Sequence, residues 1–388
     1  MGSVVWARRI TPRKNQSQTK AQPKSILKGA GLISRISSNV TGIDKREQFV
    51  CKIRLSSTLH KDFYLDLNNA QSQRSRSPMT GSTQLIQFEF IRVSGPDART
   101  FLQGQVTCDT TKITPTQSVL GALCNLKGRV IADFRAAQWG EDILLRVGAG
   151  LADPVLAVLK KYAVFSKLTL SKEAEFGALG LLVTGEPEGT SLPSAPHAVI
   201  SLSEDVLAID SGCGEAGTRC IELWGSKTSI QSDAALLATS ISTESDKAIP
   251  VATVAVARQD EWIRLEILSG VIHITRTLSE EYTPAQLNYD ISGVVDFKKG
   301  CYTGQEIVAR MFYRSTPKKR LYPLSADMQL APDAEVADSA SEEMIKPLIV
   351  AGNALLAQLD IDPASRKITL AGDPSTEFTV KEPAYFAK

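Results

Sequence analysis

The charged residues divide this 388-residue chain near residue 82. Residues 1–82 contain 15 Lys/Arg and only 4 Asp/Glu, whereas the rest of the chain contains 29 basic and 38 acidic residues. The first segment is also rich in Ser, Gln and Asn. A segment of this composition cannot bury enough apolar surface to offset the entropy that ordering removes. We therefore expect residues 1–82 to be mostly disordered and the folded part to begin near residue 83.

Three interpretations of residues 1–82 stay open: a basic tail, an acid-poor organellar presequence, or a start assigned too far upstream. The folded part is mildly acidic, which argues against a general nucleic-acid-binding surface. We therefore expect no direct nucleic-acid contact from residues 83–388. No stretch approaches the roughly 20 consecutive apolar residues of a membrane span, so we expect a soluble protein that does not enter a membrane.

At 388 residues the chain is too long for one ordinary hydrophobic core and suits two or three domains, since single cores stop growing near about 250 to 300 residues. We expect an α+β region over residues 83–320. Short apolar strands separated by turn residues follow Arg320 and predict a small β-barrel over residues 321–388. The stretch 185–217 is rich in Pro, Gly and Ser and is a candidate boundary between subdomains.

Hydrophobic periodicity and cap residues predict the main elements. Alternation from Ile86 to Phe90 predicts a strand, and Ser94-Gly-Pro-Asp97 predicts the start of a helix that Gly104 ends. Asp153-Pro154 predicts another helix start, with the Asp as cap. A further helix is expected near residue 260, with Trp262, Leu265 and Leu268 on it. Further strands are expected at 118–125, 130–136, 142–147, 321–324, 348–350, 368–371 and 378–380.

The cysteines predict free thiols rather than a disulfide framework. They stand at positions 51, 108, 124, 213, 220 and 301, with no C-x-x-C pair and no Cys/His cluster. An even count indicates disulfides in short secreted chains, and no secretory signal precedes this one. With only three His in the chain, we expect neither a self-contained zinc or iron–sulfur site nor a stably bound metal.

The segment Asp296–Arg310 carries the strongest chemical signal. Thr303-Gly-Gln-Glu306 fits the capping-box pattern and predicts that a helix begins at Thr303. Cys301 would then lie just ahead of a helix N-terminus, where partial positive charge favours the thiolate, and Lys299 would add to this stabilisation. The alternative is that Cys301 is a small buried apolar residue, as most free cysteines are.

Lys299-Gly-Cys-Tyr-Thr-Gly-Gln-Glu306 resembles the signature of the YgfZ family of folate-binding proteins, whose members support iron–sulfur enzymes. Three more stretches are similar to that family: Ser94–Thr107, Lys160–Lys167 and Pro284–Asn288. The resemblance runs from about residue 84 to the early barrel. It implies an aminomethyltransferase-like α+β fold, related to the aminomethyltransferase of glycine cleavage, in which a folate-binding region and a C-terminal β-barrel leave a central cleft.

The resemblance also implies residues that bind tetrahydrofolate or a derivative. Phe88 and Trp262 match aromatic residues that line the folate pocket, where a flat π-face suits a pterin or aminobenzoyl ring. Tyr302 and Gln305 of the signature are further candidates. Taken without the resemblance, Phe88 and Trp262 would be assigned to the hydrophobic core.

Asp133 is the acidic candidate for the folate site. Gly128–Phe134 is similar to an element of the transferases whose second Asp approaches the reactive folate nitrogen, and Asp133 falls on that Asp. Its carboxylate could hold a reduced pterin through charge-assisted hydrogen bonds. The alternative is a surface carboxylate that balances Arg129 or Arg135.

Two departures weaken any prediction of glycine-cleavage chemistry. Relatives usually read Ile-Glu-Ala-Gly where this chain has Ile267-Leu-Ser-Gly270, so that acidic position is lost. Glu266 is offset from it by two residues and is not an assured replacement. The transferases also lack the cysteine that corresponds to Cys301.

The leading hypothesis is a folate-binding accessory factor, more a partner of enzymes than an enzyme. It would use Cys301 in assembly or repair of iron–sulfur clusters in client enzymes, including tRNA-modifying ones, and its partners would be those enzymes or assembly proteins. Two alternatives stay open: a folate-dependent aminomethyl transferase with Asp133 as its acid or base, and a tRNA-modification factor that contacts RNA directly. The signature looks closer to bacterial members, so we expect a cytoplasmic location; the basic N-terminus leaves a mitochondrial one possible.

Overall fold

The computed structural model describes residues 50–53, 63–66, 87–185, 191–215, 217–242, 253–339, 343–361 and 367–387. The chain separates into two compact units, Met1–Met79 and Thr80–Lys388. In the first unit, β1 (Val50–Ile53) pairs antiparallel with β2 (Phe63–Asp66), a pairing that the sequence did not predict. Most of residues 1–82 lies outside the described residues, so the disorder expected there stays a prediction.

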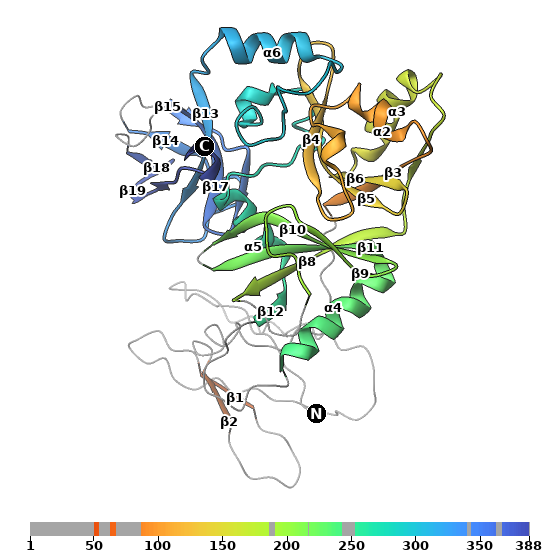
Figure 1. Cartoon of the computed structure of the whole chain (residues 1–388). Helices are drawn as coiled ribbons and strands as arrows, with labels where there is room; N and C mark the ends of the chain where they lie inside the picture. The colour runs from red at the N-terminus through yellow and green to blue at the C-terminus, as the bar shows by residue number, and fades with distance from the viewer. Residues whose placement is uncertain are drawn as a thin grey trace, which may run out of the picture. The chain divides into compact units, whose positions relative to one another are not determined.

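The second unit begins with a five-stranded antiparallel sheet, drawn in orange and yellow in Figure 1. Its order is β4-β5-β6-β3-β7, with β3 (Phe88–Ser94), β4 (Val119–Cys124), β5 (Val130–Trp139), β6 (Asp142–Gly148) and β7 (Thr169–Lys172). The strands expected from Ile86, from 118, from 130 and from 142 are confirmed, although Ile86 itself lies outside the described residues. Most of β5 is buried on both faces, which places this sheet between two layers.

Two helices and a 3₁₀ turn, η1 (Thr110–Lys112), pack with the first sheet. The predicted helix before Gly104 is confirmed as α2 (Ala98–Gln103). The helix predicted from Asp153 is α3 (Ala152–Tyr162), but Asp153 is not its cap. The Ala152 amide instead donates to Glu89 Oε2 at 3.0 Å, and Asp153 pairs with Lys172 on β7. A carboxylate from a neighbouring strand has taken over the capping role.

A second five-stranded antiparallel sheet, green in Figure 1, has the order β12-β8-β11-β10-β9. Its strands are β8 (Phe176–Thr184), β9 (Val199–Ser203), β10 (Val206–Glu215), β11 (Thr218–Ser226) and β12 (Thr253–Val256). The Pro-, Gly- and Ser-rich stretch 185–217 therefore contains two strands of this sheet. Helix α4 (Lys227–Ser242) covers one face through Ile230 and Ala234.

The other face of the second sheet packs against the first sheet. Phe90 of β3 contacts the ring of Trp224 on β11 edge to face, with ring centroids 5.2 Å apart. The predicted helix near residue 260 is confirmed as α5 (Gln259–Leu268), and its Trp262 and Leu265 enter the same core. This shared core fixes the two sheets relative to each other.

Two four-stranded sheets form the C-terminal region. One has the order β16-β17-β13-β20 and the other β15-β14-β18-β19. Leu324, Val336, Leu355 and Ile368 from both sheets share one core, so the predicted C-terminal β unit is present as two sheets. The strands are β13 (Lys319–Ser325), β14 (Val336–Asp338), β15 (Glu343–Ile345), β16 (Ile349–Ala351), β17 (Ala354–Asp360), β18 (Ile368–Leu370), β19 (Asp373–Glu377) and β20 (Thr379–Val380).

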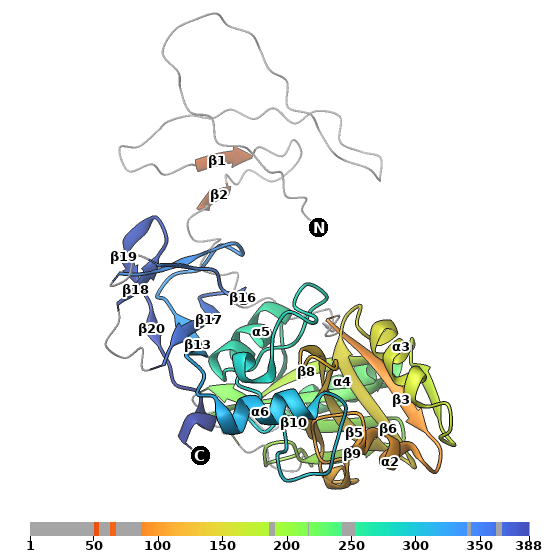
Figure 2. The same ribbon diagram turned by 90° about the horizontal axis from the view of Figure 1, so that it is seen from above.

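Turns connect α5 to α6 (Gln305–Arg314) and hold the C-terminal strands to the rest of the unit. They include the 3₁₀ turn η2 (Pro284–Leu287), and Asn288 behind it exchanges two hydrogen bonds with the backbone of Leu321. The chain ends in η4 (Ala384–Ala387). Helices α6 and α4 lie at opposite ends of the unit in Figure 1, and Figure 2 looks onto α6. No helix in the described ranges is long and apolar enough to span a membrane.

Candidate functional site

A cavity of about 570 Å³ lies between the two five-stranded sheets, the turns after α5 and the C-terminal residues. Strands β4, β5 and β6 supply one wall and β10 and β11 another, while residues 266–273 and 382–385 complete it. Ligand pockets for small molecules and cofactors have volumes of about 300 to 1,000 Å³. We call this space the central cavity.

Asp133, His273 and Glu266 form a connected acidic trio in the wall of the central cavity. His273 Nδ1 lies 2.6 Å from Asp133 Oδ2, and its Nε2 lies 3.2 Å from Glu266 Oε1. The Ile274 amide donates to Asp133 Oδ1 at 2.6 Å, and Trp262 Nε1 donates to Glu266 Oε1 at 2.7 Å. One imidazole therefore holds two buried carboxylates from different elements in fixed positions.

The charge of His273 follows from its surroundings. Burial alone would lower its pKa, but the carboxylates of Asp133 and Glu266 outweigh burial and raise the pKa to about 9. His273 is therefore protonated at neutral pH, which suits its position between two carboxyl groups. The pairing of Asp133 with His273 also overturns the alternative in which it balances Arg129 or Arg135 on the surface.

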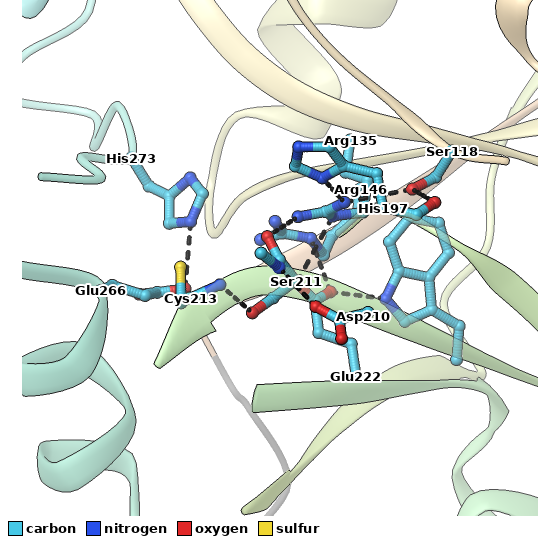
Figure 3. Close-up of polar contacts among 12 residues, drawn as sticks. Ser118, Arg135, Arg146, His197, Asp210, Ser211, Cys213, Glu222, Glu266 and His273 are labelled. Carbon is cyan, nitrogen blue, oxygen red and sulfur yellow. Dashed lines mark hydrogen bonds and ion pairs between the residues drawn. The ribbon is translucent and has the colours of Figure 1, made fainter. Parts of the chain in front are cut away.

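Arg135, Arg146 and Glu222 form a second, basic trio in the same wall (Figure 3). Arg146 Nε lies 3.0 Å and Arg135 Nε 3.6 Å from the Glu222 carboxylate, and Trp224 Nε1 donates to it at 2.7 Å. Burial raises the pKa of Glu222, but the two guanidinium groups outweigh burial and lower it overall. Glu222 is thus ionised, and two cations share one anion.

The two arginines differ in how completely they are bonded. Arg135 makes hydrogen-bond contacts to Ser118 Oγ, to His197 Nδ1 and to the carbonyl of Ser211, at 2.7 to 3.1 Å. Arg146 instead lies over the ring of Phe88, 3.7 Å from its centroid. The contacts of Arg135 link the two sheets. Arg146 instead stacks one face of its guanidinium on the Phe88 ring.

Phe88 and Trp262 are not among the described residues that line the central cavity, and their stacking on a ligand stays a prediction. Trp262 is completely buried and Phe88 is 7% exposed. Gly180 lies against the indole of Trp262, where a Cβ would come within 2.5 Å of the ring. Both rings lie behind the residues that line the cavity. There Phe88 stacks against Arg146, and Trp262 donates a hydrogen bond to Glu266.

The signature loop around Cys301 lies apart from the central cavity. Cys301 is exposed, and helix α6 begins four residues later, at Gln305. The predicted capping box at Thr303 is wrong: Gly304 occupies the cap position with φ of 83°, and the Thr303 hydroxyl donates to Gln105 Oε1 at 3.1 Å. A Cβ at Gly304 would lie 2.4 Å from the carbonyl oxygen of Asn125, so this close approach requires glycine.

Other signature residues hold the loop in place rather than line the central cavity. Lys299 Nζ donates to the carbonyls of Gln103 and Val106 and lies 5.1 Å from the Tyr302 ring centroid. Burial lowers the pKa of Lys299, although the Cys301 thiol is among the groups that oppose this shift. Tyr302 is buried, and neither it nor Gln305 appears among the described residues of the central cavity wall, so their cofactor contacts stay a prediction.

A second cavity, of about 600 Å³, lies beside the signature loop, and we call it the signature cavity. Thr303 and Cys124 line it, together with the basic side chains of Lys127, Arg129 and Lys161. Two exposed apolar side chains, Leu126 and Tyr162, also line it, and the exposed Val164 and Phe165 follow Tyr162 closely in the chain. We call this group the Phe165 patch; its members and exposed fractions are Leu126 (73%), Tyr162 (46%), Val164 (72%) and Phe165 (99%).

Of the five cysteines from residue 87 onward, one thiol is exposed and four are buried. Cys301 is exposed, whereas Cys108, Cys124, Cys213 and Cys220 are buried. Burial raises the pKa of Cys108, Cys124 and Cys213 to about 12, so these thiols stay protonated. Within the described ranges, no group of three or more His, Cys, Asp or Glu side chains is arranged to hold a metal ion.

Sequence reasoning missed His273, Arg146 and Glu222, and it left Glu266 undecided. Two of these had a usable signal. Arg146 interrupts the apolar run Ile143–Val147, and Glu222 stands between Ile221 and Leu223. A charge inside a buried strand indicates an internal ion pair.

No protein-family model matches the chain. The tRNA-modifying protein YgfZ of Klebsiella pneumoniae is 30% identical over 269 residues, which cover 68% of this chain and 76% of that protein. Proteins of the same name from Colwellia psychrerythraea and Escherichia coli are each 32% identical, over 257 and 263 residues, and 74% and 76% of their lengths are covered.

A solved structure, the glycine cleavage system aminomethyltransferase T from Bartonella henselae, aligns with a TM-score of 0.56 and 16% identity. The alignment covers 78% of this chain and 85% of that chain. It confirms the predicted α+β, aminomethyltransferase-like fold. The identities and coverage among the curated relatives confirm the resemblance seen in the signature, and this chain belongs to the YgfZ family.

Proposed function

We propose that this protein binds tetrahydrofolate or a derivative in the central cavity and is an accessory factor for assembly or repair of iron–sulfur clusters in client enzymes, including tRNA-modifying ones. The observation that carries this proposal is the Cys301 thiol, which is exposed in a loop built outside the central cavity. A buried ligand and an exposed thiol suit a protein that binds a cofactor and acts on a partner. The names of its relatives, tRNA-modifying proteins, support the client class.

The residues of the central cavity fit a reduced folate. A reduced pterin presents several N–H donors on its ring edges, and the buried carboxylates of Asp133 and Glu266 are acceptors for such donors. His273 and the Ile274 amide hold Asp133, while Trp262 holds Glu266, so these acceptors are positioned before a ligand arrives. When bound, tetrahydrofolate supplies ring nitrogens that carry one-carbon units.

The exposed thiol suits transient contact with a cluster. Thiolates are the usual protein ligands of iron–sulfur clusters, which bind four of them. Cys301 alone supplies one ligand, so the others would come from the client enzyme or an assembly protein. Lys299 and Thr303 hold the loop through Gln103, Val106 and Gln105, which keeps the thiol outside the hydrophobic core.

The Phe165 patch gives a partner a place to dock beside the signature cavity, which Thr303 of the Cys301 loop also lines. Exposed apolar groups that include an aromatic ring are typical anchors of protein interfaces. Three basic side chains, Lys127, Arg129 and Lys161, line the adjoining signature cavity beside Glu280 and Glu281, so its lining can pair with charges of both signs on a partner. We propose that client enzymes or assembly proteins bind here, without direct nucleic-acid contact by residues 83–388.

Complementation of cells that lack this protein tests the accessory role. The readout is the content of a tRNA nucleoside whose modification needs an iron–sulfur enzyme, compared for wild type, Cys301→Ser and the exposed neighbour Lys298→Ser. We expect Cys301→Ser to lower the modification at least about tenfold, on the scale of a lost functional group, and Lys298→Ser to match wild type. Full complementation by Cys301→Ser would refute a role for the thiol.

A folate-dependent aminomethyl transferase is the second candidate, favoured by one observation. Asp133 and His273 form a carboxylate–imidazole pair in the cavity wall, and such a pair can hold or move a proton. Tetrahydrofolate-dependent release of ammonia or formaldehyde from an aminomethyl donor, undiminished in Cys301→Ser, would support the transferase. No turnover by wild type under conditions of folate binding would exclude it.

The cytoplasmic location, with mitochondria as the alternative, stays a prediction that cell fractionation can test.

A further inference from the structure

Two charged trios share the central cavity. The acidic trio of Asp133, His273 and Glu266 has two carboxyl groups for one imidazole, and the basic trio of Arg135, Arg146 and Glu222 has two guanidinium groups for one carboxylate. The trios adjoin, because both contact Phe88: its ring centroid lies 3.7 Å from the Arg146 guanidinium carbon and 5.2 Å from the His273 ring centroid. The wall therefore presents acceptor and donor regions next to each other, as Figure 3 shows from His273 to Arg146.

Of the two arginines, Arg146 has more unused hydrogen-bonding capacity: among the described residues, Nε of both lacks a hydrogen-bond partner, but the Nη atoms of Arg135 make three hydrogen-bond contacts. Its residue is 2% exposed and lines the cavity, and its ion pair with Glu222 does not have the geometry of a hydrogen bond. Among the described residues, neither Arg146 Nε nor Glu222 Oε1 has a hydrogen-bond partner. Buried polar groups are nearly always satisfied, so an unsatisfied guanidinium in a cavity wall points to an acceptor on the ligand.

Phe88 and Glu222 fix the orientation of this guanidinium. The ring of Phe88 covers one face at 3.7 Å, and Glu222 holds the Nε edge at 3.0 Å. A stacked and anchored guanidinium has little freedom to turn toward another protein acceptor. Its N–H groups are therefore arranged for a ligand before that ligand binds.

We propose that Arg146 donates a hydrogen bond to an oxo group of the cavity ligand, and that in folate this group is the 4-oxo oxygen of the pterin. The inference rests on the proposed folate site. Because the trios adjoin, the acceptor that Arg146 contacts has to lie close to the donors that Asp133 and Glu266 contact. A pterin ring carries N–H groups and its oxo oxygen within one small bicycle, whereas the glutamate tail is remote from these donors.

This assignment makes Arg146 a specificity-determining residue. A 4-amino pterin replaces the oxo acceptor with an amino donor, which would face the N–H groups of Arg146. A site built to hydrogen-bond one group strongly rejects an analogue that leaves its buried partner unpaired. We expect wild type to bind tetrahydrofolate at least about tenfold more tightly than its 4-amino analogue, tetrahydroaminopterin.

The test is calorimetric titration of the full chain with tetrahydrofolate and with tetrahydroaminopterin. Wild type is compared with Arg146→Leu and with Arg146→Leu/Glu222→Gln. The double variant also removes the Glu222 charge that Arg146 pairs with, so it can be tested if the single variant unfolds. Arg92→Leu is the matched control, because Arg92 is a strand arginine with acidic partners outside the described cavity wall. Thermal unfolding verifies that each variant is folded.

Wild type should prefer tetrahydrofolate over tetrahydroaminopterin. We expect this preference to fall to about threefold or less in the Arg146 variants, the scale of one lost hydrogen bond. It should persist in Arg92→Leu. Equal binding of both compounds to wild type, or a full preference in a folded Arg146 variant, overturns this inference and leaves the folate site standing. Failure of wild type to bind either compound overturns the proposed folate site and the inference together.

Discussion

The central cavity and the signature loop use polar groups in opposite ways. In the cavity, side chains bond to side chains: His273 links Asp133 to Glu266, and Glu222 holds Arg146. In the loop, side chains bond mainly to the backbone; for example, the Lys299 amine donates to two backbone carbonyls. The first arrangement leaves charged groups on a cavity wall, whereas the second leaves one thiol exposed.

This contrast indicates a division of labour. Buried ion pairs between side chains contribute little net stability and strongly fix the position of polar groups, which suits recognition of a bound molecule. Backbone hydrogen bonds hold a loop while its reactive side chain stays accessible, which suits chemistry on a partner. Changes in one region should therefore leave the function of the other intact, and each prediction below tests this separation.

The largest effect is expected from Asp133→Asn. The change removes the carboxylate that accepts from His273 and Ile274 and, in the proposal, from the pterin. Tetrahydrofolate affinity should fall by about 100-fold, the scale of a lost charge-assisted hydrogen bond. The reaction rate of Cys301 with a thiol reagent should not change. The control is Asp142→Asn, whose partner is Arg92; an equal loss of affinity there would contradict the assignment.

A second effect should appear in the pH dependence of stability. The pKa of His273 is about 9 in the folded protein, above the ordinary value near 6.5. Its ion pairs are therefore fully stabilising below about pH 6.5, and this stabilisation is lost as the pH rises through about 9. Relative to His273→Gln, wild type should lose about 2 kcal/mol in the free energy of unfolding over this range. Denaturant titrations at several pH values measure it, and a pH-independent difference would refute a charged His273.

A third test concerns the signature loop, through Lys299→Met. The change leaves the carbonyls of Gln103 and Val106 without their donor, which should lower the free energy of unfolding by about 1 to 2 kcal/mol. Amide hydrogen exchange in residues 299–305 should accelerate, while tetrahydrofolate affinity stays within about twofold of wild type. Lys298→Met is the control. A large loss of folate affinity in Lys299→Met would show that the two regions are coupled.

The smallest effect on the folded chain is expected from Phe165→Ser. The ring is 99% exposed, so the free energy of unfolding should change by less than about 0.5 kcal/mol. Association with a client enzyme or assembly protein, measured by surface-immobilised binding, should nevertheless weaken at least about fivefold. Tyr313→Ser removes another exposed ring, on α6, and should bind normally. Equal weakening by both variants would contradict docking at the Phe165 patch.

Much of the fold could be predicted because its signals are local. The alternation at the start of β3, the apolar runs of β4, β5 and β6, and the glycine after α2 are properties of adjacent residues. The predictions that failed, the cap of α3 and the capping box before α6, depend on contacts with residues remote in the sequence. Glu89 replaces Asp153 at the start of α3, and the carbonyl of Asn125 forces the left-handed Gly304 that displaces the predicted capping box.

The site was less predictable for the same reason. Asp133 was found through its motif, and the structure does place it in the central cavity wall. Its partner His273 stands 140 residues away and belongs to no motif. The predicted aromatic residues fill the layer behind the wall, because a sequence match locates a residue on a strand or helix but not the layer that its side chain enters.

The central claim is that the folate site and the thiol are separate, and calorimetric titration of wild type, Asp133→Asn and Cys301→Ser with tetrahydrofolate tests it most directly. We predict that wild type and Cys301→Ser bind with affinities within about twofold of each other, since no lost hydrogen bond separates them, and that Asp133→Asn binds far more weakly. Loss of binding in Cys301→Ser, or unchanged binding in Asp133→Asn, would contradict the account.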